Sequence, residues 1–222
     1  MLIDLHSHTR PLSWDSDLTP DELIDLTKKA GLDGICLSEH DAFWEPERVA
    51  ELGRKHNFLV LPGVEINTEA GHVLCFGVDK YAYGMHRWPE LAEHVRAAGG
   101  VMVAAHPYRR QMPWNQAKEE EYEAALNRAG ANPLYPACTA LEGLNGRGSE
   151  AENAFSARIV ERLAMAATAG SDAHAVSDIG RCATEFEERI EGLHDLIQAL
   201  QAGRCRPVRL DARARPLQPL PA

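Results

Sequence analysis

The stretch Leu2-Ile3-Asp4-Leu5-His6-Ser7-His8-Thr9 is a short apolar run that ends in a His-x-His pattern. Side chains alternate between the two faces of an extended strand, so His6 and His8 point to the same side. Two imidazoles side by side at a strand end can bind one metal ion without unusual backbone geometry. The stretch therefore predicts the first strand of the fold and part of a metal site, whose other ligands must come from the rest of the chain.

The composition is that of an ordinary globular protein. The chain has 222 residues, of which 45% are hydrophobic and 25% charged, enough to bury the core of one large domain. No apolar run approaches the roughly 18 residues of a membrane span, and no basic segment ahead of an apolar one marks a signal peptide. We therefore expect a cytoplasmic protein without a membrane partner.

The charge and the cysteines exclude two further classes of protein. A net charge of −10 disfavours a protein that binds long nucleic acid by neutralising its phosphates. The five cysteines are scattered and form no C-x-x-C pair. We expect them to be buried free thiols in a reducing compartment, neither a disulfide framework nor a thiolate metal site.

Strand and helix patterns alternate six or seven times, which is typical of a parallel α/β protein. One helix start carries a Thr19 cap, Pro20 at the first helical position and Glu22 three residues after the cap. Apolar strands that end in polar residues indicate a barrel with its active site at the carboxyl-terminal rim. The expected strands are 2–6, 34–38, 58–67 (broken at 62–63), 71–77, 101–105, 140–145, 166–169 and 182–186, and the expected helices are 20–30, 45–56, 88–98, 116–128, 149–163 and 190–201. We predict a single domain over 1–222, in which 203–222 is an Arg/Pro-rich tail that wraps the barrel or is loosely ordered.

Polar residues at the ends of these strands form the predicted site. Six of the ten histidines fall there, which argues against six unrelated loop histidines. Imidazole and carboxylate ligands without a thiolate suit Zn, Mn or Fe, and more than four ligands suit more than one ion. The residues are His6, His8, His40, Glu65, His72, His106, Asp172 and His174. The other four histidines (His56, His86, His94 and His194) lie on or beside predicted helices, and we expect them at the surface.

This arrangement resembles the PHP (polymerase and histidinol phosphatase) family. The resemblance covers residues 1 to about 180 and includes Asp41 after His40, Pro107 after His106 and an aspartate in the 10–18 loop. It implies a distorted (β/α)7 barrel of the TIM-barrel type, a trinuclear metal centre and metal-dependent hydrolysis of phosphate esters. The expected cofactors are therefore two to three divalent ions, of Zn, Mn or Fe.

The resemblance also implies which residues bind each ion. The first would take His6, His8, Glu65 and Asp172, the second Glu65, His72 and His106, and the third Asp15, His40 and His174. Asp15 is preferred to Asp17 because the loop aspartate of similar sequences lies five residues before the helix-opening proline.

The expected chemistry is attack on phosphorus by a hydroxide held between two ions. A phosphomonoester carries about two negative charges, so an arginine beside the metals is expected to bind it. Arg109 follows His106-Pro107 and Arg147 follows Asn145, and both are candidates. Asp41 is expected to orient an imidazole or, as the alternative, to donate a proton.

The expected partner is a phosphorylated small molecule, either a metabolite or a short nucleotide. One alternative is a 3'-5' exonuclease or phosphodiesterase acting on single-stranded nucleic acid, which the acidic charge disfavours. Another is a non-catalytic metal-binding module, although no ligand position is missing. A third is an amidohydrolase, but Glu65 occupies the place where that family usually has a carboxylated lysine. The sequence does not specify the ester class, the oligomeric state or the role of the 108–136 insert.

Overall fold

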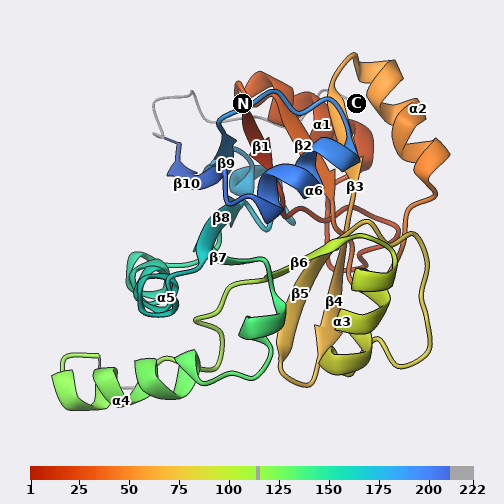
Figure 1. Ribbon diagram of the computed structural model, residues 1–222. Helices are drawn as coiled ribbons and strands as arrows, with labels where there is room; N and C mark the ends of the chain where they lie inside the picture. Colours follow the sequence, from red (N-terminus) through yellow and green to blue (C-terminus); the bar gives the residue numbers. More distant parts are fainter. Residues whose placement is uncertain (114–115, 211–222) are drawn as a thin grey trace.

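A computed structural model describes residues 1–113 and 116–210 of the chain. The fold is a distorted (β/α)7 barrel with helices on its outside (Figure 1). The strands are β1 (Leu2–Asp4), β2 (Gly34–Leu37), β3 (Leu59–Pro62), β4 (Val64–Thr68), β5 (Gly71–Phe76), β6 (Val101–Ala104), β7 (Ala140–Asn145), β8 (Ala166–Gly170), β9 (Cys182–Phe186) and β10 (Cys205–Arg209). The helices are α1 (Pro20–Lys29), α2 (Pro46–His56), α3 (Trp88–Ala97), α4 (Glu119–Gly130), α5 (Glu150–Leu163) and α6 (Leu193–Gln201).

The strands lie in two five-stranded sheets. Their orders are β10-β9-β1-β2-β3 and β4-β5-β6-β7-β8. Backbone pairs beyond the named strands join them at two places, between Ser7 and Ala173 and between His40 and Glu65. These pairs complete a ring of seven strands, β1, β2 and β4 to β8, while β3 continues into β4. The ring closes at the end of the barrel to which the predicted ligands belong.

The predicted parallel α/β arrangement has an exception at β5, where the short connection after the preceding strand allows a hairpin. This strand pairs antiparallel with both β4 and β6. Only Glu69 and Ala70 separate β4 from β5, which is enough for a hairpin but far too short for the crossover that a parallel pair needs. His72 therefore lies at the start of its strand, and the reversed direction brings it to the same rim as the ends of the parallel strands.

The predicted tail contains a strand. Residues 205–209 form β10, which pairs antiparallel with β9, and β9 in turn runs antiparallel to β1. Pro207 has no backbone N–H to donate. It is tolerated because β10 lies at the edge of its sheet, where one side of the strand needs no hydrogen-bond partner. The prediction of a loosely ordered tail is thus wrong for 205–209, which form an edge strand outside the ring of seven strands. Residues 211–222 lie outside the described part of the chain.

The predicted cap of α1 is confirmed. The Thr19 hydroxyl accepts from the Glu22 N–H at 3.2 Å, while the Glu22 carboxylate accepts from the Thr19 N–H at 2.9 Å. Ser149 and Glu152 form the same capping box at the start of α5. The helix expected from residue 116 begins later, at Glu119.

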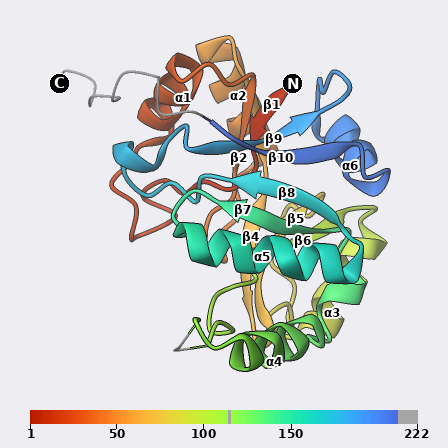
Figure 2. The same ribbon diagram turned by 90° about the vertical axis from the view of Figure 1, so that its left-hand side faces the viewer.

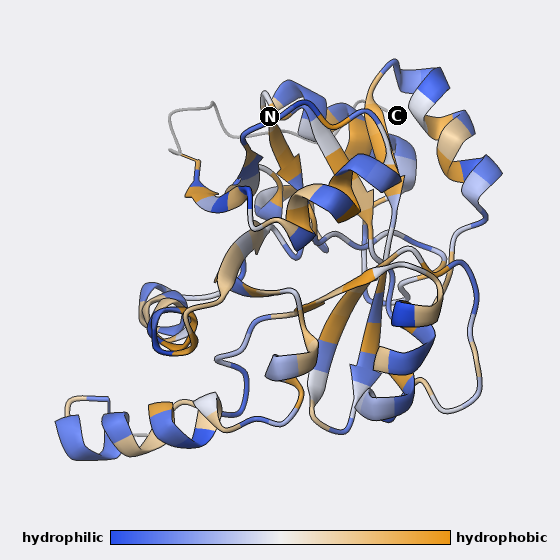
Figure 3. Cartoon of the chain, in the orientation of Figure 1, coloured by the Kyte–Doolittle hydropathy of each residue, from blue (hydrophilic) through white to orange (hydrophobic). Residues whose placement is uncertain are grey.

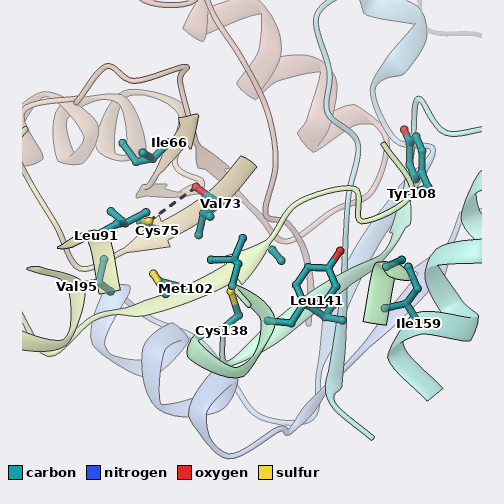
Figure 4. Packing of buried hydrophobic residues seen from close by; sticks show 14 of the residues in the cluster. Ile66, Val73, Cys75, Leu91, Val95, Met102, Tyr108, Cys138, Leu141 and Ile159 are labelled. Atoms are coloured by element: carbon teal, nitrogen blue, oxygen red, sulfur yellow. Dashed lines mark hydrogen bonds between the residues drawn. The ribbon is translucent and has the colours of Figure 1, made fainter. Parts of the chain in front are cut away.

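The buried apolar residues come from both helices and strands. In Figure 3 the strands are largely coloured as hydrophobic, whereas the helices carry both colours. The cluster in Figure 4 joins β4 to β7 with α3, α4 and α5, and it includes Ile66, Met102, Leu141 and Ile159. In the turned view, α5 lies along β7 and β8, and α4 lies beside α5 (Figure 2). The five cysteines are free, and four of them are buried. Within residues 1–113 and 116–210, no helix is both long and apolar enough to cross a membrane.

Candidate metal centre

Glu65 on β4 lies at the middle of the predicted ligands. Its Oε1 is 2.9 Å from His72 Nδ1, 3.0 Å from His106 Nε2 and 3.4 Å from His6 Nε2. Its side chain is only 1% exposed. Because β5 runs antiparallel to β4, His72 and Glu65 face the same site from neighbouring strands. One buried carboxylate therefore contacts an imidazole on β5 and imidazoles that follow the ends of β1 and β6.

Asp172, which follows β8, completes a second set of contacts. Its Oδ1 lies 3.5 Å from His6 Nε2 and 3.4 Å from His8 Nε2, and His8 Nε2 lies 3.5 Å from Glu65 Oε2. Ligand atoms at 2.0–2.1 Å from a tetrahedral zinc ion are about 3.4 Å from one another. These separations are those of ligands arranged around one ion.

Asp15 forms a third set with His40 and His174. Asp15 Oδ2 lies 3.4 Å from His40 Nε2 and 3.3 Å from His174 Nε2, and the two imidazole nitrogens are 3.3 Å apart. This triangle again has the edge length of a metal tetrahedron. Asp17 is exposed and reaches His174 through its backbone N–H, which donates to the His174 carbonyl at 2.9 Å. The structure thus brings Asp15, rather than Asp17, to these imidazoles.

Among the described residues, two ligand atoms in this region are buried and make no hydrogen bond: His6 Nε2 and His8 Nε2. Glu65 Oε2, by contrast, lies 2.7 Å from His40 Nδ1. Buried polar atoms nearly always have a partner, so such a concentration of unpartnered atoms needs an explanation. A cation bound among them supplies one. The groups close enough to share an ion are His6–His8–Asp172, His6–Glu65–His106 and His8–His40–His174.

A second layer of side chains holds these ligands. Glu142 on β7 is 1% exposed, and its Oε1 accepts from His6 Nδ1 at 3.0 Å. Its Oε2 accepts from the His106 backbone N–H at 2.8 Å and from the Asn145 amide at 3.0 Å. With its proton on Nδ1, His6 presents the Nε2 lone pair to the site. Glu142 was missed as a functional residue, although an acidic residue inside an otherwise apolar strand was the available signal.

The backbone is strained at the rim. His106 and Asp172 have positive φ angles of 31° and 53°, which residues other than glycine rarely adopt. Such strain persists only where the surroundings impose it, and it is concentrated at functional sites. Here the Asp172 N–H donates to the His6 carbonyl at 2.8 Å. Gly170 lets β8 approach so closely, since any Cβ at this position would overlap the His6 Cβ.

The carboxylates and imidazoles shift one another's pKa values. Burial opposes the charged form of Glu65, but the surrounding imidazoles, His6 foremost, bring its pKa well below the usual range. Burial likewise opposes the charged form of His6, yet Asp172, Glu142 and Glu65 hold its pKa well above 6.5. Burial lowers the pKa of His8 to about 3. The site therefore favours positive charge beside its carboxylates. In the protein without metal, protons on the imidazoles supply this charge.

The three predicted catalytic residues have different surroundings. Arg109 Nη2 lies 3.3 Å from Asp172 Oδ2 with the side chain 41% exposed, and Arg147 Nη1 lies 2.9 Å from His174 Nδ1. Asp41 is exposed, and its carboxylate accepts from the Asn67 backbone N–H at 3.0 Å. Within the described residues, no imidazole is hydrogen-bonded to Asp41, so the structure does not support its expected role in orienting one.

A cavity of about 250 Å³ adjoins the cluster. His72, His106 and Arg109 line the side toward the site, while Ala104 and Leu134 line the cavity elsewhere. Sites for drug-sized ligands usually have about 300–1,000 Å³. This cavity therefore suits a small group next to the predicted metal ligands.

One of the histidines expected at the surface is largely buried. His56 ends α2, and its side chain is 8% exposed because the ring lies against Asp21 and Asp25 of α1. His86 and His194 are exposed and His94 is half-buried.

Comparison with known proteins places these observations in a family. A sequence profile described as the PHP domain matches residues 4–142, and one described as PHP-associated matches residues 150–205. An uncharacterized protein of Methanocaldococcus jannaschii, MJ1587, is 25% identical over 117 residues, which are 49% of this chain and 68% of that protein.

Three solved structures show the same fold. PsfC from Pseudomonas syringae has 20% identity and a TM-score of 0.62, over 96% of this chain and 92% of PsfC. A two-domain protein from Bacteroides vulgatus containing a predicted PHP-like metal-dependent phosphoesterase has 20% identity and a TM-score of 0.63, over 95% of this chain and 65% of that one. An amidohydrolase from Chromobacterium violaceum has 18% identity and a TM-score of 0.60, over 95% and 98%.

Proposed function

The chain belongs to the PHP domain family of metal-dependent phosphoesterase-like proteins, and from this premise we propose that it hydrolyses a phosphate ester of a small molecule. The observation that carries the proposal is the set of buried, unpartnered ligand atoms around Glu65. A phosphate ester needs concentrated positive charge and accurate positioning more than it needs a nucleophilic side chain. A metal cluster in this site would supply that charge.

The residues present fit two to three divalent ions of Zn, Mn or Fe. His6, His8 and Asp172, with Glu65, would hold the first ion, and Glu65, His72 and His106 the second. Asp15, His40 and His174 would hold the third. Imidazole and carboxylate donors without sulfur are compatible with each of these metals. Bound ions would lower the pKa of a water molecule and polarise the phosphoryl oxygens.

The protein's own groups would position the ester. We propose that Arg109 and Arg147 bind phosphoryl oxygens, since their guanidinium groups lie beside Asp172 and His174 respectively. Asp172 supports this role of Arg109, because its Oδ2 holds Arg109 Nη2 while its Oδ1 faces His6 and His8. Asp41 remains a candidate for the proton donor to the departing alcohol, and its backbone N–H is fixed by the Glu65 carbonyl at 2.9 Å.

The partner we propose is a phosphorylated metabolite or a short nucleotide, not a long nucleic acid. The cavity beside His72 and His106 is below the usual size for a drug-sized ligand. The chain's net charge of −10 would repel a polyanion away from the metal site itself. Both observations favour a small leaving group.

A second function is suggested by the amidohydrolase of the same fold, which makes hydrolysis of a C–N bond the alternative. The two reactions can be separated directly. The full chain would be loaded with Mn, Zn or Fe and incubated with a panel of phosphomonoesters, phosphodiesters and amides, with a His6→Ala variant as the control. We expect phosphate release from a monoester that depends on both the metal and His6. Amide hydrolysis with no attack on any ester would overturn the proposal, as would the absence of hydrolysis with all three metals.

A further inference from the structure

Glu39 is a buried carboxylate whose four hydrogen-bond partners all lie outside the proposed ligand set. It follows β2 and is 0% exposed. Its Oε2 accepts from the Thr9 N–H at 2.7 Å and from the Ser13 hydroxyl at 2.6 Å. Its Oε1 accepts from the Trp44 indole N–H at 2.9 Å and from the Thr9 hydroxyl. Two of these donors are N–H groups that can only donate, one at each oxygen, so the position requires an acceptor at both ends.

The Ser13 hydroxyl joins this carboxylate to a proposed ligand. A hydroxyl has one proton and two lone pairs. The proton is given to Glu39, and the oxygen accepts from the His40 backbone N–H at 3.2 Å and lies 3.2 Å from His8 Nδ1. Since the only hydroxyl proton points to Glu39, His8 Nδ1 must donate to Ser13. The neutral His8 ring then carries its proton on Nδ1.

This proton assignment decides which His8 atom faces the site. Its Nε2 keeps a free lone pair, is buried without a hydrogen bond, and lies 3.4 Å from Asp172 Oδ1 and 3.5 Å from Glu65 Oε2. The opposite tautomer would direct an N–H at the position of the first ion and could not bind it. The direction of the Ser13–Glu39 hydrogen bond is thus linked to metal binding.

We propose that Glu39 and Ser13 are positioning residues of the metal centre: the Glu39 carboxylate orients the Ser13 hydroxyl, and the hydroxyl holds His8 in the tautomer that presents Nε2 to a metal. The proposal rests on the proposed metal-dependent function and adds two residues to it. Glu142 does the same for His6 by direct contact at 3.0 Å. On the Nδ1 side of His8, the Glu39 carboxylate acts through one serine instead.

The same hydrogen bonds also hold the loop that carries Asp15. Ser13 lies on one side of Asp15 and is fixed to Glu39 and to the His40 N–H. Ser16 lies on the other side, where its hydroxyl donates to the His8 carbonyl at 2.8 Å. Asp15 is 33% exposed, and the contacts of Ser13 and Ser16 hold the chain on both sides of it. Loss of the Ser13 contacts is therefore expected to weaken the third metal set as well as His8.

The first experiment compares Ser13→Ala with Trp44→Phe in the full chain. NMR of the imidazole nitrogens in the metal-free protein reports the His8 tautomer, and calorimetric titration with Zn reports affinity. We expect the Nδ1–H tautomer alone in the unaltered protein and a mixture in Ser13→Ala, with affinity about 10–100-fold lower. Trp44→Phe removes one hydrogen bond from the other oxygen of Glu39 and is expected to leave the tautomer unchanged.

Two outcomes would overturn the proposal: a His8 proton on Nε2 in the unaltered protein, or an unchanged tautomer and Zn affinity in Ser13→Ala. Neither measurement requires turnover. If the expected tautomers and affinities are found but no ester is hydrolysed, the proposed function fails while the positioning roles stand.

A second variant tests Glu39 itself without changing its size. In Glu39→Gln the amide nitrogen must face a donor, either the Trp44 N–H at one end or the Thr9 N–H at the other. Adding Trp44→Phe removes the first conflict, so the amide oxygen can then remain with Thr9 and Ser13. We expect Glu39→Gln to lower Zn affinity at least several-fold and the double variant to recover most of the loss. Equal affinity in Glu39→Gln and the unaltered protein, or a further loss in the double variant, would contradict the role of Glu39.

Discussion

Two groups of histidines in this molecule have opposite hydrogen-bond arrangements. His56 lies between α1 and α2, with Nδ1 2.7 Å from Asp25 Oδ1 and Nε2 2.6 Å from Asp21 Oδ1. Both of its nitrogens have a carboxylate partner. At the barrel rim, His6 has Nδ1 bonded to Glu142, while its buried Nε2 makes no hydrogen bond. Carboxylates surround both rings, so the feature that distinguishes His6 and His8 from His56 is the buried nitrogen without a hydrogen bond among the described residues.

The largest expected effect comes from Glu65→Gln, which tests the rim side of this comparison. The change keeps the volume but removes the charge shared by imidazoles from several strands. Replacing second-layer partners of metal ligands typically costs about 10–100-fold in metal affinity or activity, so a shared ligand should cost more than about 100-fold. Metal content by elemental analysis and the rate of phosphate release measure it. Full metal content in this variant would contradict a bridging role for Glu65.

Removal of the metals should reveal how much of the fold's stability depends on the unpartnered atoms. A ligand that binds only the folded state at 100 times its dissociation constant stabilises it by about 2.7 kcal/mol. For a chain of this length, chelation should therefore lower the Tm by roughly 5–10 °C. Differential scanning calorimetry with and without chelator provides the measurement. An identical Tm under both conditions would mean that the rim, like the α1–α2 interface, gains no stability from a bound cation.

Glu142→Gln is expected to have the next largest effect. The Glu142 oxygens accept from His6 Nδ1, from the His106 N–H and from Asn145. An amide nitrogen at either end would face a donor, so His6 would lose its fixed orientation. We expect metal affinity to fall about 10–100-fold, as measured by calorimetric titration. A variant with unchanged metal affinity would show that His6 can bind metal through Nε2 without the hydrogen bond from its Nδ1 to Glu142.

The pH dependence should differ in sign between the metal-free and metal-loaded protein. Burial opposes the charged form of His40. The hydrogen bond to Glu65 and the negative charges of Glu65 and Asp15 outweigh burial and raise the pKa of His40 above 6.5. In the metal-free protein this contributes stability that is fully present below pH 6.5 and is lost as the pH rises through the raised pKa. Metal binding requires the neutral ring, so metal-dependent stabilisation should grow over the same range. Tm values from pH 6.5 upward, with and without Zn, test this; parallel slopes would contradict it.

The sequence predicted the ligands better than their supports. His6, His40 and Asp172 could be placed because the direction of each strand brings its end to one rim. Glu39 and Ser13 are 26 residues apart, and no local pattern indicates that their side chains meet. Such contacts depend on the packing of several segments at once. Partners of ligands are therefore harder to predict from sequence than the ligands themselves.

Asp41 and β10 show two other limits of sequence reasoning. Asp41 was expected to orient an imidazole because it follows His40 directly. Its φ of 51° turns the chain at the strand end, and its carboxylate accepts from the Asn67 N–H instead. Residues 205–209 were not expected to form a strand, because two arginines and a proline occupy five positions and only the pairing with β9 favours extension.

The smallest expected effect belongs to the other side of the comparison, at His56. Replacing His56 by alanine removes two contacts between α1 and α2, but Asp21 and Asp25 are 49% and 40% exposed and can be solvated instead. Lys55 Nζ also stays within 2.8 Å of Asp21. We expect a loss of roughly 1 kcal/mol in the free energy of unfolding, measured by urea denaturation, with metal content and activity unchanged.

The matched control for this variant is His194→Ala. His194 is an exposed histidine on α6 and has no carboxylate contact within residues 1–113 and 116–210. Its stability should change by less than about 0.5 kcal/mol. The difference between the two variants then measures what a ring with both nitrogens paired contributes to packing of two helices. α1 follows the loop that carries Asp15, and α2 follows His40, so a disturbed contact between the two helices could reach the metal site. If His56→Ala lowered metal content, a histidine with both nitrogens paired would therefore not be purely structural. An unchanged metal content with a measurable loss of stability would show that His56 contributes to helix packing and not to metal binding, in agreement with its hydrogen bonds.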